Sequence, residues 1–143
     1  MKIGEIMTAH VEVLHPNDTI QTAAQKMRDQ NVGFLPVLEN DALIGVITDR
    51  DLVVRLLADG VKSKAIIGRD IVTTPALYCF DDQEVEQAAQ LMRDHQIRRL
   101  VVLDHEHGHV TGIVSLGDLA AHTTLDLAGI TLQHVSSEFV KAK

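Results

Sequence analysis

The chain repeats part of its own sequence. The triplet Met27–Asp29 recurs as Met92–Asp94, and the pair Ala23–Ala24 recurs as Ala88–Ala89, each 65 positions later. Repetition at a fixed spacing is typical of proteins in which one unit alone cannot cover its apolar face. At 143 residues and 45% hydrophobic content, the chain fits one domain built from two similar halves that share a core. We therefore expect its function to lie where the two copies meet.

Each copy has the pattern of an amphipathic helix followed by two strands. In the first copy Ile20, Ala23, Ala24 and Met27 follow the spacing of one helix face, with Asp18 as the expected N-cap. The second copy has the same spacing 65 residues later. This predicts two units of β-α-β-β-α order and a mixed α/β (α+β) fold. The expected hairpin strands are 34–38 with 43–47 and 100–103 with 110–114, the closing helices are 51–57 and 118–121, and short leading strands are expected around 11–14 and 76–78.

The repeat also predicts where the parts of the chain begin and end. The first copy spans 1–61 and the second 66–124, with a short polar connector between them. The remaining tail, 125–143, has apolar residues at helical intervals. For it we expect a helix that packs on the body of the protein or on a second subunit.

Composition excludes several classes of function. A net charge of −7 argues against a nucleic-acid partner, because phosphate backbones are bound by clustered Lys and Arg. No apolar run approaches the roughly 18 residues of a membrane-spanning helix, and Glu5 interrupts the segment where a signal peptide would need an apolar stretch. The lone Cys79 is expected to be a buried structural thiol rather than a reactive one. These features predict a cytoplasmic protein that does not bind membranes.

The sequence contains no motif from which we predict a catalytic or metal-binding site. There is no Ser-His-Asp arrangement at a strained turn and no Walker loop, so we expect no enzymatic activity. His105, His107 and His109 could share a metal, but they lie in a predicted turn with Gly108. We expect an exposed loop there and no metal site.

The most informative motif lies at the end of the last strand of each copy. Thr48 is followed by Asp51, and Ser115 by Asp118, so that a hydroxyl and a carboxylate meet where a helix begins. A carboxylate can accept hydrogen bonds from both hydroxyls of a ribose, and Ser or Thr can donate to a phosphate or ribose oxygen. The same spacing is also that of a capping box, in which the two residues only satisfy each other's backbone. A duplicated cap is inherited as easily as a duplicated site.

Taken together, these segments resemble a tandem pair of cystathionine β-synthase (CBS) domains, also called a Bateman module. The likeness rests on Gly45–Leu52, which ends Thr-Asp-Arg-Asp-Leu, and on Gly112–Leu119, which ends Ser-Leu-Gly-Asp-Leu. It extends over residues 1 to about 124. The resemblance implies that the repeats pack through their sheets about a pseudo-twofold axis. It also implies two clefts between them for adenosine-containing ligands such as AMP, ADP, ATP or S-adenosylmethionine.

By resemblance, the second-copy cleft is the stronger site. Asp118 would hold the ribose, Ser115 a phosphate or ribose oxygen, and Arg99 the phosphates, because a guanidinium matches phosphate oxygens. The other copy would supply the segment from Ile3 to Thr8, and the backbone near Val32 for the adenine.

The first-copy cleft would use Thr48 and Asp51, together with Ile71, Thr73 and Ile97. Phe34 stands 65 residues before Arg99 and takes its place there. Unless Arg50 replaces the missing guanidinium, we expect weaker phosphate binding in this cleft, or a single occupied site per chain. The alternative for Arg99 is a solvated charge at the start of a strand.

The resemblance implies a stand-alone regulatory module that binds an adenosyl ligand, needs no obligatory cofactor and signals to a separate effector protein. It also implies a homodimer, a flat disc formed through the helices. The alternative is a dimeric scaffold that has lost ligand binding, because fold does not determine function.

Overall fold

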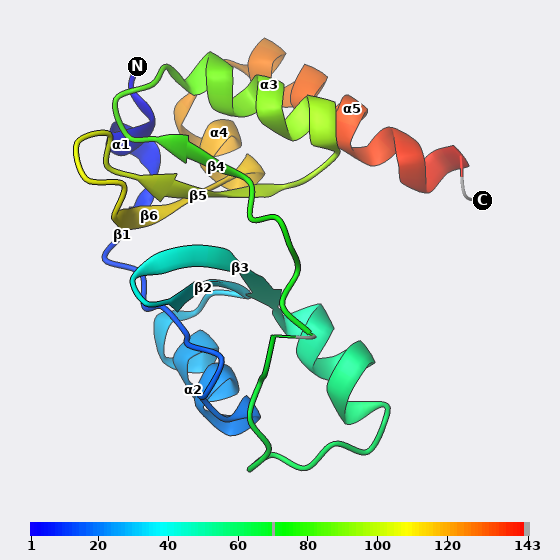
Figure 1. Ribbon diagram of the computed structural model, residues 1–143. Coiled ribbons are helices and arrows are strands. Elements are labelled where there is room, and N and C mark those ends of the chain that lie inside the picture. The colour runs from blue at the N-terminus through cyan, green and yellow to red at the C-terminus, as the bar shows by residue number, and fades with distance from the viewer. Residues whose placement is uncertain (70, 142–143) are drawn as a thin grey trace. The chain divides into compact units, whose positions relative to one another are not determined.

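The computed structural model describes residues 1–69 and 71–141, and these form two compact units. One unit combines Met1–His10 with the chain from Leu77 onward, and the other is Val11–Ala76. The units therefore do not follow the sequence repeats, because the first ten residues fold with the second repeat (Figure 1). The fold is a mixture of helices and strands, and no helix in the described ranges is long and apolar enough to cross a membrane.

The unit that contains the chain ends is built on a four-stranded sheet with helices on one face (Figure 1). The strand order is β1-β6-β5-β4, in which β5 runs antiparallel to β6 and parallel to β4. The strands are β1 (Thr8–Ala9), β4 (Tyr78–Phe80), β5 (Arg99–Leu103) and β6 (Val110–Ser115), and the helices are α1 (Ile3–Ile6), α3 (Val85–His95), α4 (Leu116–His122) and α5 (Leu125–Lys141).

The core of this unit lies between the sheet and its helices. Leu100, Val102 and Val114 point from one face of the sheet toward the apolar stripe of α3, and all are fully buried. The tail forms α5, which packs on α3 and α4 and buries Thr131 and Val135. The buried Thr131 hydroxyl donates to the carbonyl of Leu127 at 2.7 Å, so its polar atom is satisfied. The last two residues of the predicted tail, 142 and 143, lie outside the described residues.

The second unit contains one helix, a hairpin and a closing helix. These are α2 (Ile20–Gln30), β2 (Phe34–Glu39), β3 (Ala42–Thr48) and η1 (Asp51–Leu57). The hairpin turns at Asn40 and Asp41, whose φ angles of 52° and 63° suit the two-residue turn that matches strand twist. At the end of η1 the Ala58 N–H donates to the carbonyl of Val53, five residues back, which widens the helix.

The strand expected around 11–14 is reduced to a single bridge between Leu14 and Val37. The backbone before Leu14 is bonded to α2 instead of to a strand. The Glu12 N–H donates to Gln30 Oε1 at 2.8 Å, and Lys26 Nζ donates to the Val13 carbonyl at 2.8 Å.

Two further boundaries differ from expectation. The N-cap of α2 is Thr19, whose hydroxyl accepts from the Thr22 N–H at 3.0 Å; the prediction of Asp18 was wrong. The Asp18 carboxylate instead accepts from the His15 N–H at 2.9 Å. The strand expected around 76–78 forms at Tyr78–Phe80, where Tyr78 pairs with Val101 of β5.

Candidate functional site

Both hydroxyl–acid pairs form reciprocal caps. The Ser115 N–H donates to Asp118 Oδ2 at 2.8 Å, and the Asp118 N–H donates to Ser115 Oγ at 3.1 Å. Thr48 and Asp51 make the same two bonds at 2.9 and 3.1 Å. Each cap uses one carboxylate oxygen and one lone pair of the hydroxyl. The capping role therefore does not use up the hydrogen-bonding capacity of either pair.

The two carboxylates differ in what surrounds their second oxygen. Asp118 Oδ1 makes no hydrogen bond or ion pair with any residue in the described ranges. Asp51 Oδ1 lies 4.0 Å from Arg55 Nη1, which also donates to the Ile71 carbonyl at 3.1 Å. A ligand hydroxyl at Asp51 would have to share the carboxylate with the Arg55 guanidinium. At Asp118, the Oδ1 oxygen is available to accept a hydrogen bond from a ligand.

Strand register places Arg99 beside the second pair. Arg99 lies directly opposite Ser115 across β5 and β6, and Phe34 lies opposite Thr48 across β2 and β3. Residues that are direct partners project from the same face of a sheet. Arg99 is exposed and makes no hydrogen bond or ion pair with the described part of the chain, whereas Phe34 is buried. A guanidinium, a hydroxyl and an open carboxylate oxygen therefore gather at one end of the sheet in one unit only.

The segment that leads into each repeat pairs with the hairpin of the other repeat. Thr8 lies opposite Ile113, and Thr73 bridges to Val46. Both approaches need a glycine: a Cβ on Gly112 would lie 2.5 Å from the Thr8 carbonyl oxygen, and one on Gly45 would lie 2.5 Å from that of Thr73. These glycines belong to the motif found in the sequence, but their role was not predicted.

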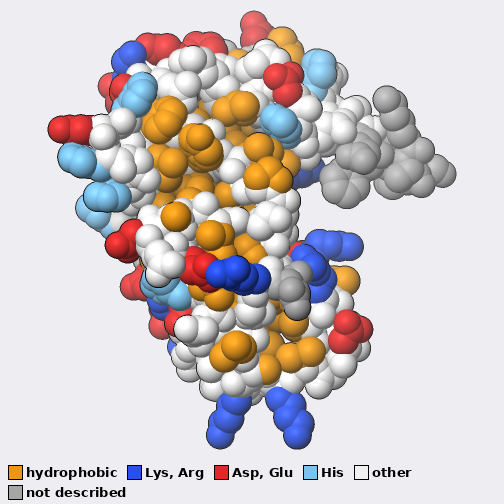
Figure 2. Space-filling view, in the orientation of Figure 1, with side chains coloured by type: hydrophobic (Ala, Val, Ile, Leu, Met, Phe, Trp, Pro, Cys, Tyr) orange, Lys and Arg blue, Asp and Glu red, His pale blue; other side chains and the backbone are white. Residues whose placement is uncertain are grey.

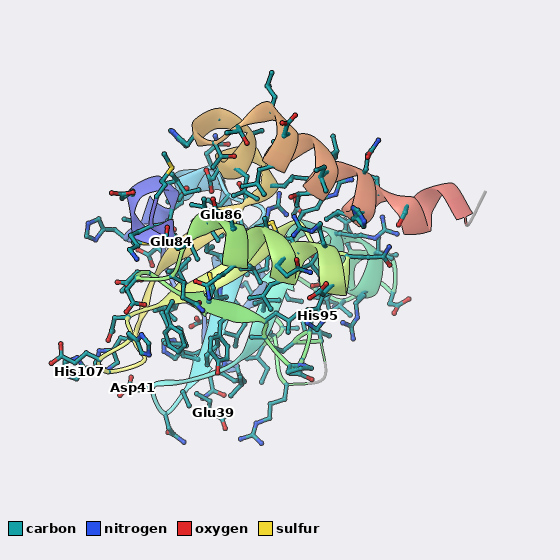
Figure 3. All side chains as sticks on the ribbon, turned by 90° about the horizontal axis from the view of Figure 1, so that it is seen from above. Glu39, Asp41, Glu84, Glu86, His95 and His107 are labelled. Atoms are coloured by element: carbon teal, nitrogen blue, oxygen red, sulfur yellow. The ribbon has the colours of Figure 1, made fainter. Side chains whose placement is uncertain are left out.

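Glu84, the N-cap residue of α3, binds the first two residues of the chain (Figure 3). Its carboxylate accepts from Lys2 Nζ at 2.6 Å and from the terminal amine of Met1 at 3.1 Å. The hydrogen bond from Lys2, followed by that from Met1, holds the pKa of Glu84 below its ordinary value.

The remaining predicted residues fall into different surroundings. Ile3 is fully buried in the core, and its N–H donates to the Gln83 carbonyl at 2.9 Å. The Ile3 carbonyl accepts from the Met7 N–H at 3.0 Å, and a contact of Ile3 with a ligand stays a prediction. Val32 is half-buried against the core of Val11–Ala76, and Ile97 is half-buried against the core of the other unit. Their contacts to a ligand stay predictions.

The histidine loop is organised by hydrogen bonds to carboxylates. His105 Nδ1 lies 2.9 Å from Asp82 Oδ2, and its ring stacks on Phe80. The backbone N–H of His107, and then that of His109, donate to Asp104 and hold its pKa below the usual range. Across residues 1–69 and 71–141, no group of three or more His, Cys, Asp or Glu is arranged to hold a metal.

Cys79 is a buried thiol on the edge strand β4 and belongs to the core of its unit, with 1% of its surface exposed. Burial raises its pKa to about 12, because the thiolate would lose its hydration. This agrees with the expectation of a structural thiol.

Comparison with known proteins gives close relatives along most of the chain. YhcV, a CBS domain-containing protein of Bacillus subtilis, is 37% identical over 137 residues, which are 95% of this chain and 96% of that protein. Hypoxic response protein 1 of Mycobacterium tuberculosis is 32% identical over 139 residues, which are 96% of this chain and 90% of that protein.

Solved structures agree with this similarity. A crystal structure of Hypoxic Response Protein I with two coordinated zinc ions has a TM-score of 0.74 at 30% identity, covering 87% of this chain and 100% of that one. The CBS domain pair of protein MJ0100, in complex with 5′-methylthioadenosine and S-adenosyl-L-methionine, has a TM-score of 0.73 at 26% identity, with coverages of 85% and 94%. CBSX2 in complex with AMP has a TM-score of 0.66 at 26% identity, with coverages of 92% and 98%.

The model of the CBS domain family matches residues 3–58 and 67–123, which are the two repeats. With two matches in tandem and a relative that aligns with 95% of it, this chain belongs to the CBS domain family.

Proposed function

We propose that this chain is a regulatory module that binds an adenosine-containing ligand at Asp118, Ser115 and Arg99. The observation that carries the proposal is the grouping of these residues at one end of the sheet, with Asp118 Oδ1 unbonded and Arg99 unpaired within the described residues. The MJ0100 pair binds 5′-methylthioadenosine and S-adenosyl-L-methionine, and CBSX2 binds AMP. Ligands of that class fit a carboxylate for the ribose diol and a guanidinium for phosphate.

The three groups would act on different parts of the ligand. Asp118 would accept hydrogen bonds from the ribose hydroxyls through its open oxygen, while its other oxygen keeps the cap of α4. Ser115 would donate its hydroxyl hydrogen, because its Oγ serves the Asp118 N–H only as an acceptor. Arg99 would pair with phosphate, and Thr8, held beside β6, would contribute a further hydroxyl.

We propose the first-repeat pair as a weaker site, or none. Phe34 offers no charge to phosphate, and Asp51 is shared with Arg55. Asp51 and Asp118 therefore form a matched pair: both cap a helix through the same bonds, and only one is expected to hold a ligand.

Signalling would not require catalysis by this chain. A ligand shifts the equilibrium between two conformations of a protein only if it binds one of them more tightly than the other. The signal therefore depends on the conformation that the ligand favours. We propose that this conformation is recognised by a separate effector protein in the cytoplasm, and that the module works as a homodimer.

Thermal unfolding with added nucleotide tests the proposal. A ligand present at 100 times its dissociation constant should add about 2.7 kcal/mol of stability, or about 9 °C for a protein of this size. The ligands to compare are AMP, ADP, ATP and S-adenosylmethionine. Asp118→Asn keeps an oxygen that can accept from the Ser115 N–H, so it should fold normally and lose the shift.

Asp51→Asn is the control, because it makes the same change in the other cap and should keep the shift. The rival function is a dimeric scaffold without a ligand, and it is favoured by the fact that both acids already have a structural role. No shift with any of the four compounds would support the scaffold.

A further inference from the structure

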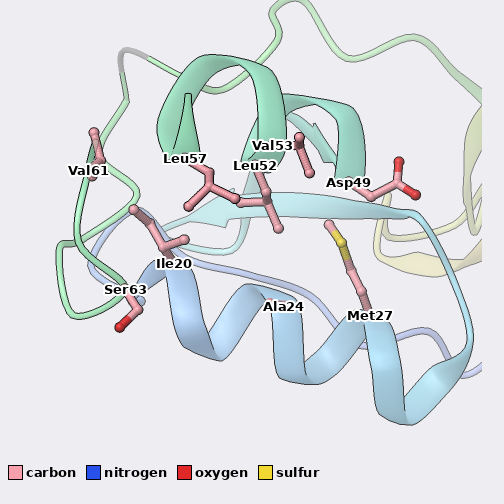
Figure 4. Close-up of a pocket in the computed structure, with 9 residues that line it drawn as sticks. All are labelled: Ile20, Ala24, Met27, Asp49, Leu52, Val53, Leu57, Val61 and Ser63. Carbon is pink, nitrogen blue, oxygen red and sulfur yellow. The ribbon is translucent and has the colours of Figure 1, made fainter. Parts of the chain in front are cut away.

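A groove of about 510 Å³ lies between the starts of α3 and α5 and the end of α4, and we call it the α3–α4–α5 groove. The apolar residues that line it are Met1, Val85, Leu127 and Ile130. A smaller groove of about 340 Å³, between α2 and η1, is lined mainly by apolar side chains, with Asp49 at one end (Figure 4). The larger groove differs from it because two carboxylates, those of Glu86 and Asp126, lie along its edge.

The fold leaves apolar side chains of this groove in contact with water. Met1 is 56% exposed and Ile130 is 49% exposed. Leu125, which immediately precedes the lining residue Asp126, is 87% exposed. The same helix, α5, buries Thr131 on its inner side, so it turns apolar residues outward while it buries a polar one. Exposed apolar side chains that gather beside a groove indicate a surface that another molecule covers.

The carboxylates indicate the charge of that molecule. Glu86 and Asp126 are exposed, and neither makes a hydrogen bond or ion pair within residues 1–69 and 71–141. The terminal amine of Met1 is paired with Glu84 at 3.1 Å. Each of the two acids lies in the first turn of a helix, where the helix dipole favours a negative charge, so charge alone does not make a site. Together with the apolar lining, however, the acids give the groove a negative rim, and Figure 2 shows further Asp and Glu side chains where the helices of this unit lie.

The helix α4 joins this groove to the proposed ligand site. It begins at the cap formed by Ser115 and Asp118 and ends at His122, which lines the groove. With seven residues, α4 is about 10 Å long. A protein bound in the groove would therefore contact the far end of the helix whose first turn would hold the adenosyl ligand.

We infer that the α3–α4–α5 groove binds a segment of the effector protein in which a large apolar side chain is flanked by Lys or Arg. This rests on the effector of the proposed function and names the surface that the effector contacts. The apolar side chain packs against Leu127 and Ile130, and the cations pair with Glu86 and Asp126. The exposed apolar surface continues past the groove to Leu125, which favours a protein segment over a small organic cation.

Isothermal titration calorimetry with two short synthetic peptides tests this inference. The peptides have the same leucines, and they carry Lys in one and Glu in the other at the remaining charged positions. The wild type should bind the Lys peptide more tightly than the Glu peptide, and added NaCl should weaken that binding because exposed charges are screened. The double variant Glu86→Lys with Asp126→Lys should bind the Glu peptide more tightly instead. A basic peptide is attracted to any part of a chain with a net charge of −7, so the reversal of preference decides, and not the affinity alone.

A second pair of variants tests the apolar part of the groove. Ile130→Ser should weaken binding of the Lys peptide about 10-fold, because the apolar surface that the peptide would cover is removed. Leu132→Ser is the matched control, because Leu132 lies on the same helix and is 46% exposed but does not line the groove. It should bind the peptide like wild type. All four substituted residues are exposed, so the variants should fold normally, which circular dichroism checks.

Three results would overturn the inference: a wild type that does not bind the Lys peptide, a double variant that still prefers the Lys peptide, or equal weakening in Ile130→Ser and Leu132→Ser. Other occupants of the groove have their own signatures, and each would also overturn it. Loss of self-association in Ile130→Ser with unchanged peptide binding would assign the groove to a second copy, and complete displacement of the peptide by spermidine would assign it to a small amine. The nucleotide-dependent thermal shift of the double variant should equal that of wild type, so failure of the groove can be told apart from failure of the ligand site.

Discussion

Replacing Gly112 by alanine should loosen the segment that places Thr8 beside the candidate site. The new Cβ would lie 2.5 Å from the Thr8 carbonyl oxygen and 2.9 Å from the sulfur of Met7. The sulfur is at the end of a flexible side chain and can move. The carbonyl belongs to the backbone of β1, which is paired with β6, so it must retreat by about 0.9 Å from its 2.5 Å to reach ordinary contact at 3.4 Å.

The magnitude follows from two opposing effects. Overpacking a well-packed site costs typically 1–3 kcal/mol. Alanine also reduces the entropy of the unfolded chain, which returns about 0.4–1 kcal/mol. The steric effect is the larger one. With an unfolding entropy of about 0.3 kcal/mol/K for 143 residues, each kcal/mol lowers Tm by about 3 °C, so a net cost of up to about 2.6 kcal/mol should lower Tm by up to about 8 °C.

Differential scanning calorimetry measures this change, and Gly117→Ala is the control. A Cβ on Gly117 would lie 3.5 Å from Ser115 Oγ, an ordinary contact, and alanine favours the helix by about 0.5–1 kcal/mol. The control should therefore have an unchanged or slightly higher Tm. A Gly112→Ala variant as stable as Gly117→Ala would refute the close packing of the lead segment on β6.

Two further predictions concern the thiol and the exposed arginine. Because burial raises the Cys79 pKa to about 12 from an ordinary value of 9.0, the folded state disfavours the thiolate. The contribution of the protonated Cys79 thiol to the free energy of unfolding is therefore fully present below pH 9 and is lost as the pH rises toward 12. In denaturant titrations at pH 8 and at pH 10.5, the free energy of unfolding should fall less between the two pH values for Cys79→Ala than for the wild type. An equal loss in both proteins would contradict the burial. Arg99→Gln should change Tm by less than about 2 °C, because the side chain is exposed and unpaired within the described residues. The same variant should bind AMP, ADP and ATP about 10- to 100-fold more weakly than the wild type. Binding of S-adenosylmethionine, which has no phosphate, should be unchanged, and equal weakening of all four would show that Arg99 does not act on phosphate.

The main elements could be predicted because their signals are local. The stripes of α2 and α3 repeat with a helical period, and the hairpins alternate with polar turns, in both copies. The prediction of a strand around 11–14 failed because the backbone of Glu12 and Val13 bonds to side chains of α2, which is a tertiary effect. Thr19 and Asp18 are both good caps, and only the first turn of the helix decides between them.

Part of the candidate site could also be found from the sequence. The 65-residue offset was enough to pair Phe34 with Arg99, and strand register bears this out. The burial of Ile3 and the close approach at Gly112 depend on how distant segments pack, so neither spacing nor composition indicates them. The contact of Arg55 with Asp51 is local, because the two residues are four apart in η1; this spacing indicates the contact, but it was not predicted.

Isothermal titration calorimetry of AMP and S-adenosylmethionine into three proteins tests the central claim most directly: that Asp118, and not Asp51, holds an adenosyl ligand. We predict one site per chain in the wild type, the same site in Asp51→Asn, and no binding in Asp118→Asn. Binding that survives in Asp118→Asn, or that is lost only in Asp51→Asn, would contradict the assignment.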